Sequence, residues 1–142
     1  VDVQPDLSPA TCGDIVKILT IGEPEQLDRA EEAIVAANLP VKLVRSFHLY
    51  LEVLPPTGGK GAGLQALLAH LGIGRERCLA IGDYLNDLDL LAAAGLGVAV
   101  KNAHPGLRAV ARRETLSNME DGVAAVLDAL VEGREIGTPI EG

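Results

Sequence analysis

The first third of the chain predicts three strands and one helix. Residues 15–21 form an apolar, β-branched run that stops at a glycine, which is typical of a strand. Residues 41–44 and 49–54 are two further apolar runs of strand length. Residues 25–38, between the first and second strands, carry apolar side chains at helical spacing. This β-α-β-β order follows a polar lead-in, residues 1–14, without a period.

The pattern changes after residues 55–59, a turn-rich segment with two prolines and two glycines. Leucines then recur at i, i+3, i+4 and i+7, so an amphipathic helix is predicted from Lys60 to Gly72. Ser117 and Glu120 have the capping-box spacing that opens a final helix. The remaining apolar pattern predicts strands at 78–81 and 96–100, and helices at 88–94, 104–113 and 123–130.

Helices and strands that alternate with short connections are the signature of a parallel sheet wrapped by right-handed crossovers. We therefore expect an α/β fold with a lead-in over 1–14, a small α/β unit over 15–55 and a parallel-sheet unit over 56–132. The tail over 133–142 has no period and is expected to be frayed. Ligands of such sheets bind at the carboxyl ends of strands.

Charge and composition narrow the function. The 142 residues include 12 Lys and Arg against 20 Asp and Glu, a net charge of -8, which argues against nucleic acid as a partner. No apolar run is long enough to span a membrane, and the first residues do not resemble a signal peptide, so we expect a cytoplasmic protein without a membrane partner. Cys12 and Cys78 form no C-x-x-C motif and are expected to be reduced thiols.

Oxygen-bearing side chains follow the predicted strand over 78–81. Asp83, Asn86 and Asp87 stand at i, i+3 and i+4, so their side chains converge at the strand end and the start of the next helix. Such a set suits Mg²⁺, which takes one or two carboxylates with water and phosphate, far better than zinc. The alternative is structural: Asn86 and Asp87 cap the helix, and Asp83 makes an Asx-turn.

Lys60 is a cation in a glycine-rich helix entry, where N–H groups and the helix dipole favour a phosphate. The surrounding residues do not form a Walker A motif, and a lysine exposed to solvent is the alternative. Asn102, after the strand over 96–100, either reaches a ligand or caps the following helix. The three histidines have no partner at metal-ligand spacing.

Several of these pieces together resemble one family. Lys60-Gly61, G-D-Y-L-N-D over 82–87, Gly97-Val-Ala with Asn102-Ala103, and Asp121-Gly-Val resemble the C-terminal half of a Cof-type phosphatase of the haloacid dehalogenase superfamily. The resemblance covers roughly residues 15–131. It implies a partial Rossmann-like parallel sheet with helices on both faces, preceded by the second half of an α/β cap. Arg45, Ser46 and Leu51-Glu52 resemble the last hairpin of that cap.

The resemblance also implies roles for individual residues. Asp83 would bind Mg²⁺, with Asn86 and Asp87 completing or orienting its ligand shell. Lys60 would be the catalytic lysine that stabilises the transferring phosphoryl group, and Asn102 would lie near the phosphate. The implied activity is Mg²⁺-dependent hydrolysis of small phosphorylated metabolites, such as sugar phosphates.

One departure from the family is large. Members carry a D-x-D-G-T/S loop whose first aspartate is the nucleophile, whereas the only D-x-D in this sequence, Asp87-Leu-Asp89, falls in a predicted helix. Without the nucleophile the chain is expected to be inactive alone. The family's nucleophile strand would also pair beside residues 78–81, so we expect an open strand edge here. We expect one of two arrangements to complete this edge. Either the chain self-associates through strand pairing or domain exchange, or it is a piece of a longer polypeptide that supplies the strand.

Two other functions remain open at this point. The first is a non-catalytic module that binds Mg²⁺ and phosphate for regulation or assembly. The second is a nucleotide-binding Rossmann domain. The sequence does not favour this hypothesis, because Gly95-Leu-Gly97 continues into Val98 and Ala99 and not into a glycine-rich loop that binds phosphate.

Overall fold

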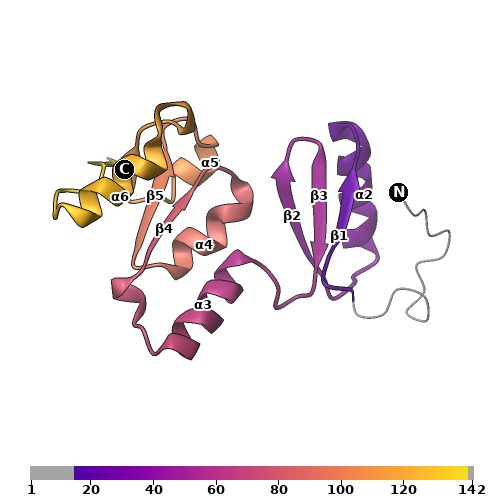
Figure 1. Ribbon diagram of the computed structural model, residues 1–142. Helices are drawn as coiled ribbons and strands as arrows, with labels where there is room; N and C mark the ends of the chain where they lie inside the picture. The colour runs from indigo at the N-terminus through magenta and orange to yellow at the C-terminus, as the bar shows by residue number, and fades with distance from the viewer. Residues whose placement is uncertain (1–14, 141–142) are drawn as a thin grey trace.

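The computed structural model describes residues 15–140, which form two sheets, each with its own helices (Figure 1). The cap sheet has three antiparallel strands in the order β1-β3-β2. It is accompanied by helix α2 (Pro24–Ala36), and its strands are β1 (Ile18–Ile21), β2 (Lys42–Phe47) and β3 (Tyr50–Leu54). The predicted β-α-β-β order is therefore present, although β1 begins three residues later than expected.

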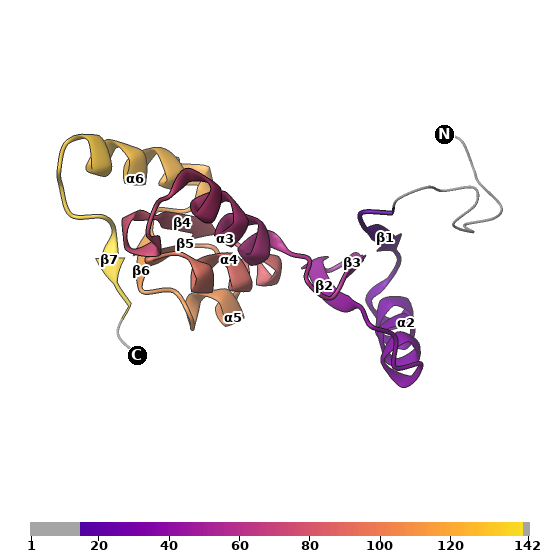
Figure 2. The ribbon, with the colours of Figure 1, turned by 90° about the horizontal axis from the view of Figure 1, so that it is seen from below.

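Helix α2 covers one face of the cap sheet (Figure 2). Pro24 occupies its first turn, and a capping box between Glu23 and Gln26 closes its N-terminus. Leu27 of this helix and Leu51 of β3 are fully buried. The cap sheet therefore has one face packed against α2 and a second face free to line a site.

The core sheet has four strands in the order β4-β5-β6-β7. The first three are parallel, and β7 runs antiparallel to β6. These strands are β4 (Leu79–Gly82), β5 (Leu96–Val100), β6 (Arg113–Thr115) and β7 (Thr138–Pro139). Within residues 15–140, β4 pairs on one side only, so the open edge that the sequence predicts is present at β4.

Within residues 15–140, four α-helices and three short 3-10 helices accompany the core sheet. Helix α3 begins at Lys60 and ends before Gly72, as the sequence predicts. The α-helices are α3 (Lys60–Leu71), α4 (Leu88–Ala93), α5 (Pro105–Arg108) and α6 (Gly122–Val131). The 3-10 helices are η1 (Arg75–Arg77), η2 (Leu85–Asp87) and η3 (Asn118–Glu120).

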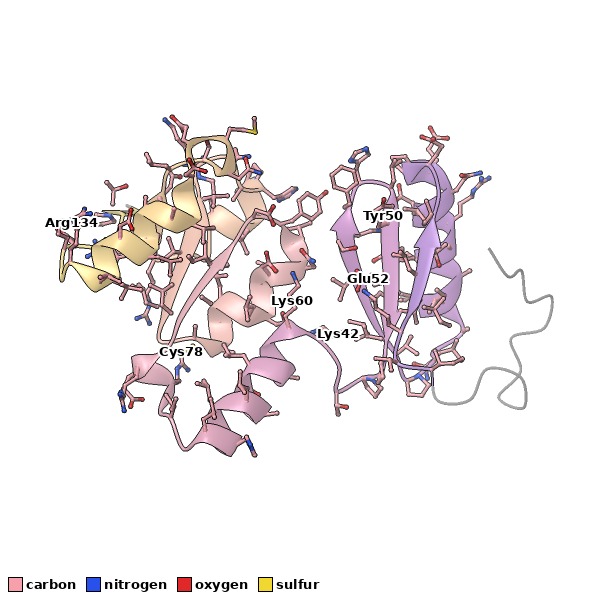
Figure 3. The ribbon with its side chains drawn as sticks, in the orientation of Figure 1. Lys42, Tyr50, Glu52, Lys60, Cys78 and Arg134 are labelled. Atoms are coloured by element: carbon pink, nitrogen blue, oxygen red, sulfur yellow. The ribbon has the colours of Figure 1, made fainter. Side chains whose placement is uncertain are left out.

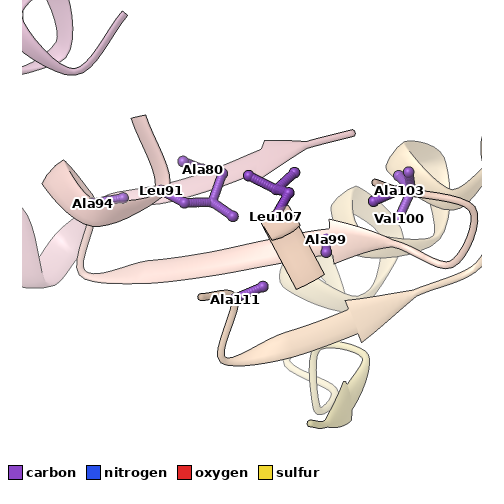
Figure 4. Close-up of a cluster of buried hydrophobic side chains, with 8 residues drawn as sticks. All are labelled: Ala80, Leu91, Ala94, Ala99, Val100, Ala103, Leu107 and Ala111. Atoms are coloured by element: carbon purple, nitrogen blue, oxygen red, sulfur yellow. The ribbon is translucent and has the colours of Figure 1, made fainter. Parts of the chain in front are cut away.

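Small side chains let the helices approach the core sheet closely. Five of the eight residues in the main buried cluster are alanines, and Leu91 and Leu107 fill the space between them (Figure 4). The buried side chains Val126 and Ala129 of α6 lie outside this cluster. In agreement with this, α5 and α6 lie on opposite sides of the sheet (Figure 2), so helices cover both faces, as predicted.

The predicted helix over 104–113 is wrong in its length. Helix α5 ends at Arg108, because the chain turns and residues Arg113–Thr115 add β6 to the sheet. Leu107 is fully buried and anchors the short helix. His104, expected within this helix, is its N-cap: Nδ1 accepts a hydrogen bond from the backbone N–H of Gly106 at 3.0 Å.

The last part of the chain also differs from the prediction. Ser117 and Glu120 do form a capping box, but it closes η3, two residues before α6. The tail that we expected to be frayed is ordered up to Ile140, since β7 pairs with β6 and the Arg113 guanidinium binds Glu135 Oε1 at 2.7 Å. Ile140 also packs against the buried core cluster.

Residues 1–14, which include Cys12, lie outside the described part of the chain. Cys78 is a free, half-buried thiol that packs against the core cluster. Among the described helices, none has the length and apolar content to cross a membrane.

Candidate functional site

The first residue of α3 is held in place by an unusual backbone turn. Gly59, the N-cap, has φ of 125°, a conformation that residues with a side chain rarely adopt. A Cβ on Gly59 would also lie 2.6 Å from Lys42 Nζ. A Cβ on Gly61 would collide with the backbone of Asp89 in α4. Glycines on both sides of Lys60 therefore allow α3 to begin against α4.

Lys60 and Asp87 form an ion pair between Nζ and Oδ1. The Lys60 side chain is 50% exposed, whereas that of Asp87 is 6% exposed. The second oxygen of Asp87, Oδ2, accepts a hydrogen bond from the backbone N–H of Asp83 at 3.1 Å. The buried Asp87 carboxylate thus links the lysine at the start of α3 to the loop that follows β4.

Asp83 lies at the carboxyl end of β4, where a ligand site of a parallel sheet is expected. The residue is exposed, and its carbonyl oxygen accepts a hydrogen bond from the His104 N–H at 2.8 Å. The other two aspartates of this segment, Asp87 and Asp89, are in ion pairs with lysines. Asp83 therefore presents its carboxylate to solvent from a loop that is fixed on both sides.

Asn86 lies in η2 and is half-buried. It lines the same cavity as Lys60, so the structure brings these two predicted residues together. Asn102 is not among the residues that line this cavity. Its Nδ2 donates to Asn118 Oδ1 at 2.8 Å, and its Oδ1 accepts from the Asn118 N–H at 3.0 Å. This amide pair joins the loop after β5 to η3.

Two ion pairs near Lys60 were not assigned a role from the sequence. Lys42 Nζ, at the start of β2, lies 2.7 Å from Asp89 Oδ2 in α4, and it also donates to the Gly58 carbonyl at 3.3 Å. Lys17 Nζ lies 3.1 Å from Glu52 Oε2 on β3. The sequence feature that could have indicated the Lys17–Glu52 pair is the position of Glu52, a charged residue inside the apolar run of β3.

The Glu52 carboxylate is largely withdrawn from solvent, with 17% of the side chain exposed. Burial raises the pKa of Glu52, but hydrogen bonds from Lys17 and Ser46 and the positive charges of Lys17 and Lys60 outweigh it. The net result is a pKa below the ordinary value of 4.5. Glu52 is therefore an anion at neutral pH, and its field reaches Lys60.

A cavity of about 280 Å³ separates the two sheets at this position. Its lining includes Lys17, Val44, Glu52 and Leu54 from the cap side, and Lys60 and Asn86 from the core side. Lys60, at the start of α3, lies on the side of the core that faces the cap, and Lys42 and Glu52 lie on strands of the cap opposite it (Figure 3). The cavity thus places charged groups of both units around one space.

The three aromatic residues of the chain meet where the tip of the cap hairpin contacts the core. The rings of Phe47 and Tyr50 lie 5.6 Å apart, and Phe47 lies 6.3 Å from Tyr84. Tyr84, next to Asp83, also packs edge-on against His104 at 5.2 Å. Edge-to-face and tilted pairs at these distances are favourable, so the cluster ties the cap hairpin to the loop that carries Asp83.

The oxygen-bearing side chains after β4 fit a Mg²⁺ ion. Asp83 offers a solvent-facing carboxylate and Asn86 an amide oxygen, whereas both oxygens of Asp87 are already engaged. Within residues 15–140, no group of three or more His, Cys, Asp and Glu side chains could hold a metal ion. Mg²⁺ keeps several waters and takes few protein ligands, so one carboxylate and one amide oxygen are a chemically suitable donor set for it.

Comparison with known proteins agrees with this fold. A solved haloacid dehalogenase-like hydrolase from B. subtilis superposes with a TM-score of 0.76 at 32% identity, over 84% of this chain and 43% of that one. A family model described as haloacid dehalogenase-like hydrolase matches residues 6–127. The chain therefore belongs to the haloacid dehalogenase-like hydrolase family, which confirms the resemblance found in the sequence.

Curated relatives match over part of their length. The HMP-PP phosphatase of Escherichia coli is 36% identical over 105 residues, which are 73% of this chain and 41% of the relative. The 5-amino-6-(5-phospho-D-ribitylamino)uracil phosphatase YitU of Bacillus subtilis is 42% identical over 77 residues, 54% of this chain and 28% of the relative. The chain thus spans less than half the length of these two relatives.

Proposed function

We propose that this chain supplies the metal- and phosphate-binding part of a Mg²⁺-dependent phosphomonoester hydrolase that acts on small phosphorylated metabolites, such as sugar phosphates. The observation that carries the proposal is the connection from Lys60 through the buried Asp87 carboxylate to the backbone of Asp83. Membership of the hydrolase family supports it, as do relatives that are named as phosphatases.

Each residue has a distinct part in this proposal. Asp83 is the metal ligand, Asn86 completes the ligand shell, and Asp87 orients Asp83 through its N–H. The ion would neutralise charge on the phosphoryl oxygens. Lys60 has three N–H donors, of which one binds Asp87, so the others are free to hold a phosphoryl oxygen. Asn102 is proposed to lie near the phosphate.

The nucleophile is proposed to come from outside this chain. In the only D-x-D of the sequence, Asp87 is buried against Lys60 and Asp89 is paired with Lys42 inside α4. Both oxygens of Asp87 are engaged, and Asp89 is held by Lys42 within α4, so neither stands as a free carboxylate at the end of a strand. We therefore expect the 142-residue chain to be inactive alone.

The same observation favours a second candidate function. A site with a metal ligand and a phosphate-binding lysine but without a free nucleophile would bind Mg²⁺ and phosphate without turnover. Such a chain would serve as a regulatory or assembly module. The two candidates differ in one respect: the hydrolase gains activity when a chain that carries a D-x-D-G-T/S loop is added, and the module does not.

The test is Mg²⁺-dependent phosphate release from 4-nitrophenyl phosphate by this chain, with Asp83→Asn as the matched variant. We expect no release from either protein, together with saturable phosphate binding that requires Mg²⁺ and is lost in Asp83→Asn. Turnover that disappears in Asp83→Asn would contradict the proposal that the nucleophile lies outside this chain. Phosphate binding that ignores both Mg²⁺ and Asp83 would contradict the site.

The open edge of β4 leads to a proposal about partners. Within residues 15–140 this strand pairs with β5 alone, and an unpaired edge presents N–H and C=O groups that recruit another strand. We propose that the edge is completed either by a second copy of this chain, through strand pairing or domain exchange, or by another segment of a longer polypeptide.

A further inference from the structure

The cavity beneath Lys60 contains a charged pair that the phosphate chemistry does not use. Lys17 and Glu52 face each other at 3.1 Å on the cap side of this space, and Lys60 lies on the core side. Charged groups are costly to bury unless they are paired. Glu52 is nevertheless only 17% exposed, and it lines an open cavity instead of a packed interface.

The Lys17 and Glu52 pair still has hydrogen-bonding capacity. A carboxylate accepts about four hydrogen bonds, and Glu52 receives one from Lys17 and one from Ser46. Lys17 is 48% exposed and has two further N–H donors. The pair can therefore accept and donate at the same time, which is what a hydroxyl group requires of its partners.

The walls and size of the cavity limit what else fits. Val44 and Leu54 provide apolar surface beside the pair, which suits the C–H groups of a short carbon chain. Its volume, about 280 Å³, is at the lower end of the range for small-molecule sites. A second phosphate or carboxylate on the ligand would meet the anionic Glu52, so a neutral polar group is favoured there.

We propose that Glu52 and Lys17 form a subsite for the hydroxyl groups of a phosphorylated polyol or sugar whose phosphate lies on Lys60. This inference rests on the proposed function, because it takes Lys60 as the phosphate-binding group. It assigns specificity to two cap residues that have no part in metal binding.

The test compares two ligands of equal length that differ only in hydroxyl groups, D-glucitol 6-phosphate and n-hexyl phosphate. Binding to the 142-residue chain is measured by calorimetry with Mg²⁺, for the wild type and for Glu52→Gln. The exposed Glu32 on α2 provides the control variant Glu32→Gln, which changes the same charge away from the cavity. Circular dichroism establishes that each variant is folded.

We expect the wild type to bind glucitol 6-phosphate about tenfold more tightly than hexyl phosphate, since only glucitol 6-phosphate has hydroxyl groups that can form hydrogen bonds to the charged Glu52 and Lys17 side chains. Glu52→Gln should remove this preference, with hexyl phosphate affinity changed less than twofold, and Glu32→Gln should keep it. Equal affinity of the wild type for the two ligands would overturn the subsite alone. The subsite would also be overturned if a folded Glu52→Gln variant bound both ligands more weakly by the same factor.

Failure of the proposed function has a different result. Lys60→Ala should abolish binding of both ligands if Lys60 holds the phosphate. If both ligands bind unchanged to Lys60→Ala, or if neither binds to the wild type, the proposed function fails and the subsite fails with it.

Discussion

Lys42 at the start of β2 and Asp89 in α4 form an ion pair of 2.7 Å, and their side chains are 34% and 32% exposed. Lys42 belongs to the cap sheet and Asp89 to a helix of the core, and the two residues are separated by 47 positions in the sequence. Lys42 also binds the Gly58 carbonyl in the connecting segment. One side chain therefore joins the cap, the connection and the core immediately beside the residue that begins α3.

This pair should contribute modestly to stability. Because both side chains are about one-third exposed, solvent screening limits the coupling free energy to about 0.5–1 kcal/mol. We expect this value from a double-mutant cycle with Lys42→Met and Asp89→Asn, measured by urea unfolding, and a decrease at high salt. Strictly additive effects of the two substitutions would show that the pair is not coupled.

Two glycines near the start of α3 should respond to alanine with opposite signs. Gly59→Ala should lower the free energy of unfolding by about 1–3 kcal/mol, because φ is 125° and the new Cβ would meet Lys42 Nζ at 2.6 Å. Gly63 lies inside the helix, and a Cβ added there would have nothing within 4 Å. Gly63→Ala should therefore raise the free energy of unfolding by about 0.5–1 kcal/mol. Urea unfolding of both variants checks the pair of values. A destabilised Gly63→Ala would contradict the open surroundings of that position.

Removal of the buried Asp87 carboxylate should destabilise the protein. Asp87→Ala leaves the Asp83 N–H without its acceptor and Lys60 without its partner, at a cost of about 1–3 kcal/mol. Asp128→Ala on the exposed part of α6 is the matched control, and it should be neutral or slightly stabilising, since alanine is the better helix former. Chemical denaturation measures both, and equal effects of the two variants would argue against a special role for Asp87.

The pH dependence of Glu52 has a definite sign. Its pKa in the folded chain lies below 4.5, so the folded state binds this proton less tightly than the unfolded state. The stability that Glu52 contributes is therefore fully present above pH 4.5 and is lost as the pH falls through the folded pKa. An NMR titration of the Glu52 side chain should show a midpoint below 4.5, and Lys17→Met should raise it. A midpoint that does not respond to Lys17→Met would contradict the ion pair.

The open edge of β4 predicts association. Sedimentation velocity over increasing concentrations should show a dimer or larger species, because the unpaired strand is available to a second chain. A separate strand that pairs with the edge of β4 should compete with this association. A folded chain that stays monomeric at all concentrations would show that strand pairing between copies does not occur.

The parts of the site that the sequence predicts are local. Asp83, Asn86 and Asp87 are close in sequence, so helical spacing and the end of a strand are enough to bring them together. Lys60 was placed at a helix start by its flanking glycines and the leucines that follow. Its contact with Asp87 joins two segments 27 positions apart, and neither the sequence pattern nor the family resemblance predicts it.

The parts that the sequence does not predict depend on distant pairing. Strand β6 has three polar residues, Arg113–Thr115, and carries no periodic signal of its own. The tail is ordered because β7 pairs with β6, about 25 positions earlier, and because Arg113 binds the carbonyls of Ile136 and Gly137 at 3.0 and 3.3 Å. Neither contact has a local pattern, so a helix over 104–113 and a frayed tail were the natural expectations.

The position of Gly59 has a mechanical consequence. The connection from the cap to the core passes through Gly58 and Gly59, and Lys60 follows directly. Any torsional rotation at Gly59 that tilts the cap also turns the peptide unit to which Lys60 is attached. The orientation of the cap and the direction of the Lys60 side chain therefore depend on the same backbone torsion angles. A substitution that restricts rotation at Gly59 would change the orientation of the cap and the direction of Lys60 together.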